Sequence, residues 1–125
     1  MNYLLDTHTL LWWLADEPGL STKARSVISD PHNMIFVSSA STWEITIKKA
    51  LGKLIAPSNL GQVITECGFL ELPITITHSV AVGNLSTIHD DPFDRIIIAQ
   101  ALTEKLSIVT RDSIIPQYKI PVIQA

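Results

Sequence analysis

Four carboxylate residues occupy equivalent places in this sequence, because each stands where an apolar, strand-like run gives way to a helix-like segment. If the strands are parallel, their carboxyl ends share one edge of the sheet, where open α/β folds form their binding crevice. Side chains from distant parts of the chain would then meet in space. The four residues are Asp6, Glu44, Asp94 and Asp112.

Such a cluster is suited to binding a divalent metal ion. Two carboxylates about 5 Å apart repel by roughly 3 kcal/mol at an effective dielectric constant near 20, so four of them require protons or cations nearby. Oxygen-only ligands favour Mg²⁺ or Mn²⁺. A metal ion held this way lowers the pKa of bound water and stabilises charge on a phosphodiester. The predicted chemistry is therefore metal-dependent phosphodiester hydrolysis.

Other chemistries find less support in the residue types. Zinc fits poorly, because the single cysteine, Cys67, and the histidines show no paired ligand spacing. His8 and His89 lie in segments near the predicted cleft, but each is expected to be a surface or hydrogen-bonded side chain. The sequence also has no glycine-rich phosphate loop, no G-x-S-x-G elbow and no Cys-His pair.

Each acid also has a structural explanation as a helix cap. Ser41 and Glu44 match a capping box, and Asp91 precedes Pro92 at the first position of a helix, with Asp94 at the third. Asp6 can likewise cap the segment that follows it. Capping needs one acceptor per helix, however, and serine, threonine or asparagine serve as well as aspartate. Carboxylates at all four sites therefore favour a shared metal site.

The elements that must position the acids alternate along the chain. Strand-like runs occupy residues 2–5, 34–38, 69–74, 107–110 and 122–123. Helix-like segments occupy residues 9–15, 21–29, 41–51, 57–68, 76–85 and 93–105, and one more helix is expected before the last strand. Because parallel strands need crossover connections, the pattern predicts an α/β fold, with a mainly parallel central sheet of four to five strands and helices on both faces.

Length and composition limit the remaining possibilities. The chain has 125 residues, 46% of them apolar and 17% charged, which predicts a single domain over residues 1–125. A net charge of −3 argues against nucleic-acid binding through an overall positive field, but it allows a nucleic acid held through metal ions. A cytoplasmic location is expected, because the start of the chain lacks a signal pattern and no apolar run is long enough to cross a membrane.

At these same residues the sequence resembles the PIN-domain ribonucleases, and more narrowly the VapC-type toxins of type II toxin–antitoxin systems. The resemblance runs through essentially the whole chain. Residues 91–101 are the most specific match, and residues 4–8, 41–45 and 109–112 resemble the other acidic motifs in order.

The resemblance implies a PIN-like fold and a metal-dependent endoribonuclease that leaves a 5′-phosphate and a 3′-hydroxyl. It makes Asp6, Glu44, Asp94 and Asp112 the catalytic and metal-binding residues, with Mg²⁺ or Mn²⁺ as the cofactor. It also implies a cognate antitoxin and a homodimer. Asp91 either assists the cluster through water or only caps its helix.

Several further residues are candidates for support or substrate contact. Arg95 and Arg111 adjoin acids and can hold a phosphate, although Arg95 can also pair with Asp91. The lysines form a basic patch that is either a guide for RNA or a solvated helix face. Trp12, Trp13 and Trp43 are expected in the core or in dimer contacts. The remaining candidates are Thr7 and Thr110, which can orient the acids, and Lys48, which forms the patch with Lys49 and Lys53.

Two rival functions remain open from the sequence. A phosphoryl hydrolase could use Asp6 as a nucleophile, but the D-x-D signature of haloacid-dehalogenase-like enzymes needs an aspartate where this chain has His8. A phosphorelay receiver domain fits less well, because Arg111 stands where a lysine is needed. A catalytically silent PIN-like interaction module is disfavoured by the presence of all four acids.

Overall fold

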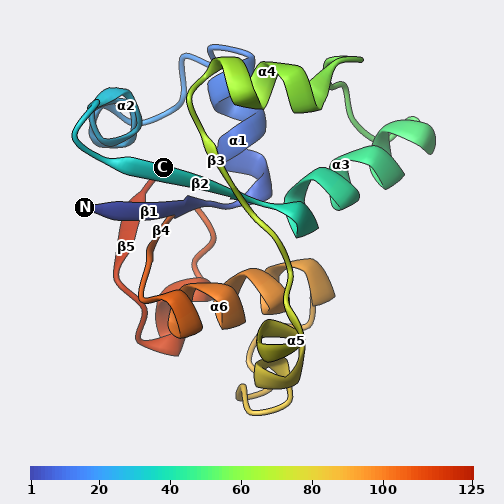
Figure 1. Ribbon diagram of the computed structural model, residues 1–125, viewed down its shortest axis with the longest axis vertical. Coiled ribbons are helices and arrows are strands. Elements are labelled where there is room, and N and C mark those ends of the chain that lie inside the picture. The colour runs from blue at the N-terminus through green and yellow to red at the C-terminus, as the bar shows by residue number, and fades with distance from the viewer.

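In the computed structural model, which describes residues 1–125, a five-stranded sheet lies between two groups of helices (Figure 1). The spatial order is β3-β2-β1-β4-β5, and every neighbouring pair is parallel. The predicted parallel α/β fold is confirmed. The strands are β1 (Asn2–Leu5), β2 (Met34–Ser38), β3 (Leu70–Leu72), β4 (Ser107–Thr110) and β5 (Val122–Gln124).

The connections create one topological switch point in this sheet. The chain places β2 and β3 on one side of β1, and β4 and β5 on the other side. Leu5, the last residue of β1, pairs with Val37 of β2 and with Val109 of β4. The carboxyl ends of these three strands are therefore level, and the crevice expected at a switch point lies beyond them.

Helices cover both faces of the sheet, with α1, α2 and α4 on one face and α5 and α6 on the other (Figure 1). None of the helices combines the length and the apolar character required to cross a bilayer. The expected last helix is a short 3-10 helix, η1 (Ile115–Tyr118). The α-helices are α1 (Thr7–Leu14), α2 (Thr22–Ser29), α3 (Ser39–Ala50), α4 (Leu60–Glu66), α5 (Ile76–Val82) and α6 (Pro92–Glu104).

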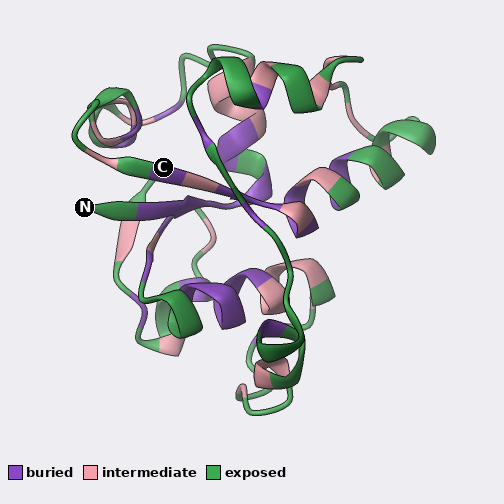
Figure 2. Ribbon diagram, viewed as in Figure 1, coloured by how far each residue is buried: buried purple, intermediate pink, exposed green.

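The two layers form because successive strand residues point to opposite faces. Tyr3 and Leu5 of β1 belong to the core beneath α1 and α2, whereas Leu4 belongs to the core beneath α6. Figure 2 shows the buried residues concentrated on β1 and on part of α6. Burial on both faces explains why the strands read as short, continuous apolar runs.

A buried polar network ties α6 to the start of α3. The side-chain oxygen of Gln100 accepts a hydrogen bond of 2.6 Å from the Ser38 hydroxyl, and its amide nitrogen donates to the carbonyls of Leu72 and Pro73. Ser38 also caps α3, because its hydroxyl oxygen accepts from the Ala40 amide. The network thus fixes the helix that carries Glu44 against the helix that carries Asp94.

Candidate active site

Asp6 lies directly after β1 and is only 5% exposed. One carboxylate oxygen accepts a hydrogen bond of 2.8 Å from the Thr9 amide, and the other accepts from the Thr110 hydroxyl. Asp6 is therefore the N-cap of α1, as the capping alternative predicts, and it also faces the end of β4. Burial raises its pKa above the ordinary aspartate value, although the hydrogen bonds from Thr110 and Thr9 oppose this.

Glu44 is not a helix cap, so the capping-box explanation of this residue is wrong. Helix α3 begins at Ser39 rather than at residue 41, and its N-cap is Ser38. Glu44 therefore lies beyond the first turn, and it is only 4% exposed. Its carboxylate accepts hydrogen bonds from the Thr7 hydroxyl at 2.7 Å and from Lys48 at 2.6 Å. These two side chains hold a buried carboxylate that has no capping role.

Asp94 lies in the first turn of α6. Its neighbour Asp91 caps the helix, because the Asp91 carboxylate accepts from the amides of Phe93 and Asp94 at 2.8 and 3.3 Å. The pKa of Asp94 is raised to about 7, mainly by burial and further by the charges of Asp91, Asp6 and Glu44, against the opposing effect of His89. The predicted acids from three elements therefore act on one another electrostatically.

Asp112 follows β4 and belongs with His89 and Asp94 to a group of closely spaced ligand atoms that does not include Asp6 or Glu44. One of its oxygens accepts from the Ile114 amide at 2.7 Å, and the other lies 2.8 Å from His89 Nε2. Burial raises the pKa of Asp112, but the hydrogen bonds from His89 and the Ile114 backbone outweigh it, so the pKa lies below the usual value. Ligand atoms of His89, Asp94 and Asp112 all lie within 4.8 Å of one another.

His89 is the site residue that sequence reasoning undervalued. Its Nε2 atom contacts Asp112 and also lies 3.2 Å from Asp94 Oδ2. Burial lowers the pKa of His89, but the Asp112 hydrogen bond and the charges of Asp94, Asp112 and Asp91 together hold it above the ordinary value. The available signal was its position two residues before Asp91, directly upstream of the segment that most resembles PIN domains.

The two arginines considered for phosphate binding are engaged elsewhere. The Arg95 guanidinium donates to the carbonyls of Val82, Ser86 and His89 at 3.1–3.3 Å, and it forms no ion pair with Asp91. Arg111 donates to the carbonyls of Gly19 and Ala125 and lies 4.1 Å from the Trp12 ring centroid. Both guanidinium groups therefore stabilise the fold by donating hydrogen bonds to backbone carbonyls.

The remaining candidates divide between the site and the surface. Thr7 and Thr110 hold Glu44 and Asp6, and Lys48 is the one lysine of the basic patch that contacts a site acid. Lys49 and Lys53 are exposed. The side chain of Trp43 packs edge-on against Phe93, at 5.4 Å between ring centroids, and remains 60% exposed.

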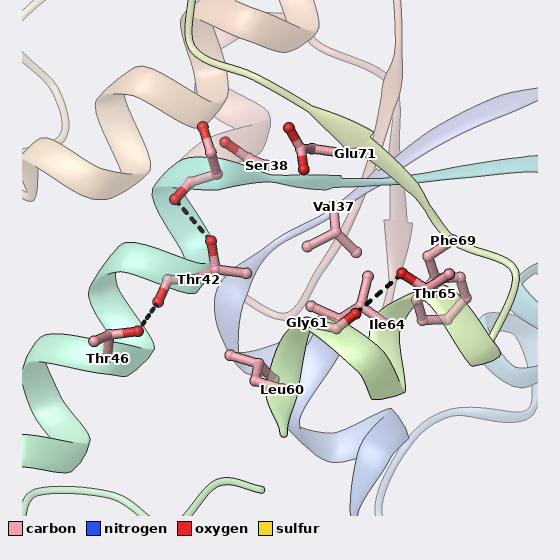
Figure 3. Close-up of a pocket in the computed structure, with 11 residues that line it drawn as sticks. Val37, Ser38, Thr42, Thr46, Leu60, Gly61, Ile64, Thr65, Phe69 and Glu71 are labelled. Atoms are coloured by element: carbon pink, nitrogen blue, oxygen red, sulfur yellow. Dashed lines mark hydrogen bonds between the residues drawn. The ribbon is translucent and has the colours of Figure 1, made fainter. Parts of the chain in front are cut away.

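A separate pocket of about 340 Å³ lies between α3, α4 and β3 (Figure 3). The hydroxyls of Thr42, Thr46 and Thr65 line it, and each donates to a carbonyl of its own helix. Glu71 is its only acidic residue, and none of the four acids of the crevice reaches it. The chemistry of hard oxygen ligands therefore belongs to the crevice and not to this pocket.

The donor set of the crevice matches a hard divalent cation. Asp6, Glu44 and Asp112 each have both carboxylate oxygens fixed by one hydrogen-bond donor apiece. Each oxygen retains a second lone pair. The pKa of Asp94 is raised by burial and by the neighbouring acids, so a bound cation would favour its ionised form. Carboxylate oxygens in this state are the ligands that Mg²⁺ and Mn²⁺ prefer.

Comparison with known proteins gives a consistent picture of the fold. A chain in DNA-bound VapBC from Salmonella typhimurium is similar, with a TM-score of 0.69, 18% identity and coverage of 98% of this chain and 97% of that chain. A chain in VapBC2 from Rickettsia felis, bound to a promoter DNA fragment, has a TM-score of 0.68, 15% identity and 98% coverage of both chains. A chain in VapBC-1 from nontypeable Haemophilus influenzae has a TM-score of 0.67, 19% identity and coverage of 99% and 98%.

At the level of sequence, no curated protein matches the chain. The family model for the PIN domain does match, and it covers residues 3–121, which include all four acids of the crevice. The chain therefore belongs to the PIN domain family.

Proposed function

We propose that this chain is the toxin of a toxin–antitoxin pair and acts as a metal-dependent endoribonuclease in the cytoplasm. In this proposal residues 1–125 are one PIN-like nuclease domain that hydrolyses RNA phosphodiester bonds. The observation that carries it is the convergence of acids on Asp94, whose pKa of about 7 reflects burial and the charges of Asp91, Asp6 and Glu44. Membership of a family of nucleases supports the same reaction class.

The proposed metal ligands are Asp6, Glu44, Asp94 and Asp112, and Mg²⁺ or Mn²⁺ is the proposed ion. A bound ion supplies a Lewis acid that makes water more acidic and offsets charge on the phosphodiester oxygens. Thr110 and the Thr9 amide hold Asp6 in place, and Thr7 and Lys48 hold Glu44. These donors fix the carboxylates before substrate arrives, which reduces the reorganisation needed during the reaction.

RNA is the proposed substrate, and the basic patch is its proposed guide. Lys48, Lys49 and Lys53 extend from the crevice along the end of α3. Because the whole chain carries a charge of −3, a local patch and a divalent cation are needed to attract a polyanion. The arginines stabilise the fold rather than bind phosphate in this proposal, because their guanidinium groups already donate to carbonyls.

A cognate antitoxin and a second copy of the chain are the proposed partners. The similar VapBC structures contain both members of such pairs by name, which supports an antitoxin. Residues 11–14 of α1 are apolar but only partly buried, so α1 offers a surface to that partner. A second apolar area includes Trp43, which is 60% exposed, and Ile74, which is 37% exposed, and this area supports homodimer formation.

The proposed function is tested by measuring metal binding and RNA cleavage on the same variants. Mn²⁺ is expected to raise the melting temperature of the wild-type protein, and Asp6→Asn is expected to abolish that increase. Cleavage of a total RNA sample is expected to require the metal and to fall by more than roughly a hundredfold in Asp6→Asn and Asp94→Asn. The matched control is Asp16→Asn, because the Asp16 side chain is solvent-exposed and pairs only with Arg25.

The chemical form of the product separates this function from its rivals. Sequencing of RNA ends is expected to show new 5′-phosphates that depend on Mn²⁺. An equal increase in melting temperature for wild type and Asp6→Asn would contradict the proposed ligand set. Metal binding without any cleavage of RNA would instead identify a silent interaction module.

A further inference from the structure

Hydrogen bonds fix the backbone of His89 at both its amide and its carbonyl. Its backbone amide donates to the Tyr118 hydroxyl at 2.8 Å, and its carbonyl accepts from Arg95 at 3.2 Å. Tyr118 in turn donates to the Ser86 carbonyl. The loop before α6 is thus tied to η1 and to α6 itself, and the imidazole enters the crevice from a fixed backbone.

The hydrogen bonds of the ring determine which nitrogen carries the proton. The Asp91 amide donates to His89 Nδ1 at 3.2 Å, so Nδ1 presents its lone pair. A neutral imidazole has one N–H group, which must then be on Nε2. Nε2 faces Asp112 Oδ2 at 2.8 Å and donates to it. Neither nitrogen is therefore free to bind a metal ion, although His89 and the two acids have the spacing of a ligand set.

We infer that His89 is a positioning residue for the metal site, which orients Asp112 without ligating the ion; this inference rests on the proposed function. The Ile114 amide holds one oxygen of Asp112 and His89 holds the other, so the carboxylate cannot rotate freely. The Nε2 atom also lies 3.2 Å from Asp94 Oδ2, so the ring contacts both acids. Donors of this kind fix the direction of a ligand's remaining lone pairs.

A ligand role and a positioning role make different predictions about the metal. An imidazole ligand would shift preference toward zinc, nickel or copper and away from Mg²⁺. A donor to the carboxylates preserves an all-oxygen site suited to Mg²⁺ and Mn²⁺. The two roles are distinguished by whether a nitrogen nucleus is bonded directly to the ion. This can be measured without any RNA cleavage.

The test uses Mn²⁺ titration calorimetry and pulsed electron paramagnetic resonance on the full-length protein. The variants are His89→Ala, which removes the ring, and His89→Gln, whose amide nitrogen can donate from nearly the place of Nε2. The control is His32→Ala, because His32 is exposed and contacts only Asp30. Asp94→Asn is included to test the proposed metal ligands separately.

We expect wild-type protein with Mn²⁺ to show no coupling to a directly bonded nitrogen. We also expect His89→Ala to weaken Mn²⁺ binding by roughly 10-fold to 100-fold, and His89→Gln to retain most of the affinity. A directly bonded nitrogen that disappears in His89→Ala would overturn the inference, because His89 would then be a ligand. Unchanged affinity in His89→Ala would also overturn it, as would equal losses in the alanine and glutamine variants.

The failure of this inference is distinguishable from failure of the proposed function. If wild type binds Mn²⁺ and Asp94→Asn does not, the proposed metal site stands whatever the His89 variants show. If wild-type protein binds no Mn²⁺, both the site and the role of His89 are refuted together.

Discussion

At the scale of single residues, the four acids differ in how their charges are balanced. Both oxygens of Asp6, Glu44 and Asp112 accept hydrogen bonds from donors within the chain. Asp94 has only His89 beside it, at 3.2 Å, and its pKa is raised to about 7. Ionisation of Asp94 therefore disfavours the metal-free fold, and a bound cation would offset that effect.

This imbalance predicts a pH-dependent effect of Asp94→Asn in the absence of metal. The pKa of Asp94 in the folded state lies above the ordinary aspartate value of 3.8, so the contribution of Asp94 to stability is present at low pH and lost as pH rises toward about 7. Each pH unit in that window costs the folded wild type at most roughly 1.4 kcal/mol, because solvent screens the partly exposed carboxylate. Asp94→Asn is expected to melt higher than wild type at pH 8 and equally at pH 4, by calorimetry with a chelator present.

The same variant has an opposite effect when metal is bound. Saturating Mn²⁺ is expected to stabilise wild type above Asp94→Asn at pH 8, because only the wild type retains the full ligand set. Asp16→Asn should follow wild type under both conditions, since its carboxylate is exposed. A metal-free Asp94→Asn protein that is no more stable than wild type at pH 8 would contradict the raised pKa.

At the scale of elements, the sequence predicted the strands better than the helix ends. Residues 2–5, 34–38 and 107–110 were predicted as strands and are observed with these bounds, because buried parallel strands read as short apolar runs. Helix α3 begins two residues earlier than predicted. Ser38 rather than Ser41 caps it, because Ser38 is held by Gln100, a contact across 62 positions that no local pattern reveals.

The parts of the site that were missed depend on similar long-range contacts. The positions of the four acids followed from the motifs, but the role of His89 depends on Asp94 and Asp112, which come from different elements. The arginines were candidates because they adjoin acids in the sequence. Spacing alone does not reveal that their guanidinium groups face carbonyls.

The contacts of Gln100 predict that Gln100→Leu destabilises the fold and the site together. Leucine removes the partner of the Ser38 hydroxyl and of the carbonyls of Leu72 and Pro73, which costs about 1–3 kcal/mol for each buried group left unpaired. The melting temperature is expected to fall by at least several degrees, with weaker Mn²⁺ binding because α3 loosens. The control is Gln62→Leu on the exposed side of α4, and equal melting of both variants would refute the prediction.

The carbonyl contacts of Arg95 predict a structural phenotype for Arg95→Met. Loss of the bonds to Val82, Ser86 and His89 is expected to lower the melting temperature and to speed proteolysis between residues 83 and 91. A residue that only bound phosphate would instead raise KM for RNA and leave melting unchanged. Limited proteolysis with mass spectrometry distinguishes the two outcomes.

At the scale of the whole molecule, an apolar groove of about 370 Å³ lies beside the crevice. Trp43 and Phe93 line it, and each is adjacent in sequence to a proposed metal ligand, Glu44 or Asp94. Its lining also includes Ile74, which is 37% exposed. Apolar area of this kind is stabilised by burial in an interface, so a dimer that covers it would bring two crevices near each other.

This surface predicts the effect of Trp43→Ser on self-association. Wild-type protein is expected to be a dimer by light scattering after size-exclusion chromatography, and Trp43→Ser is expected to shift it toward monomer. Ile55→Ser is the matched control, because Ile55 is 96% exposed but lies outside the groove. A monomeric wild type, or equal behaviour of the two variants, would exclude this surface as the interface.

The hydrogen bond from Thr110 to Asp6 spans 104 positions, and that from Thr7 to Glu44 spans 37. A ribosome must therefore synthesise nearly the whole polypeptide before the Thr110–Asp6 hydrogen bond can form. Nascent chains and early truncation products lack Asp112 and its strand, so the proposed toxin would be harmless to the cell during its own translation. Its proposed cleavage of RNA would begin only after the finished chain leaves the ribosome.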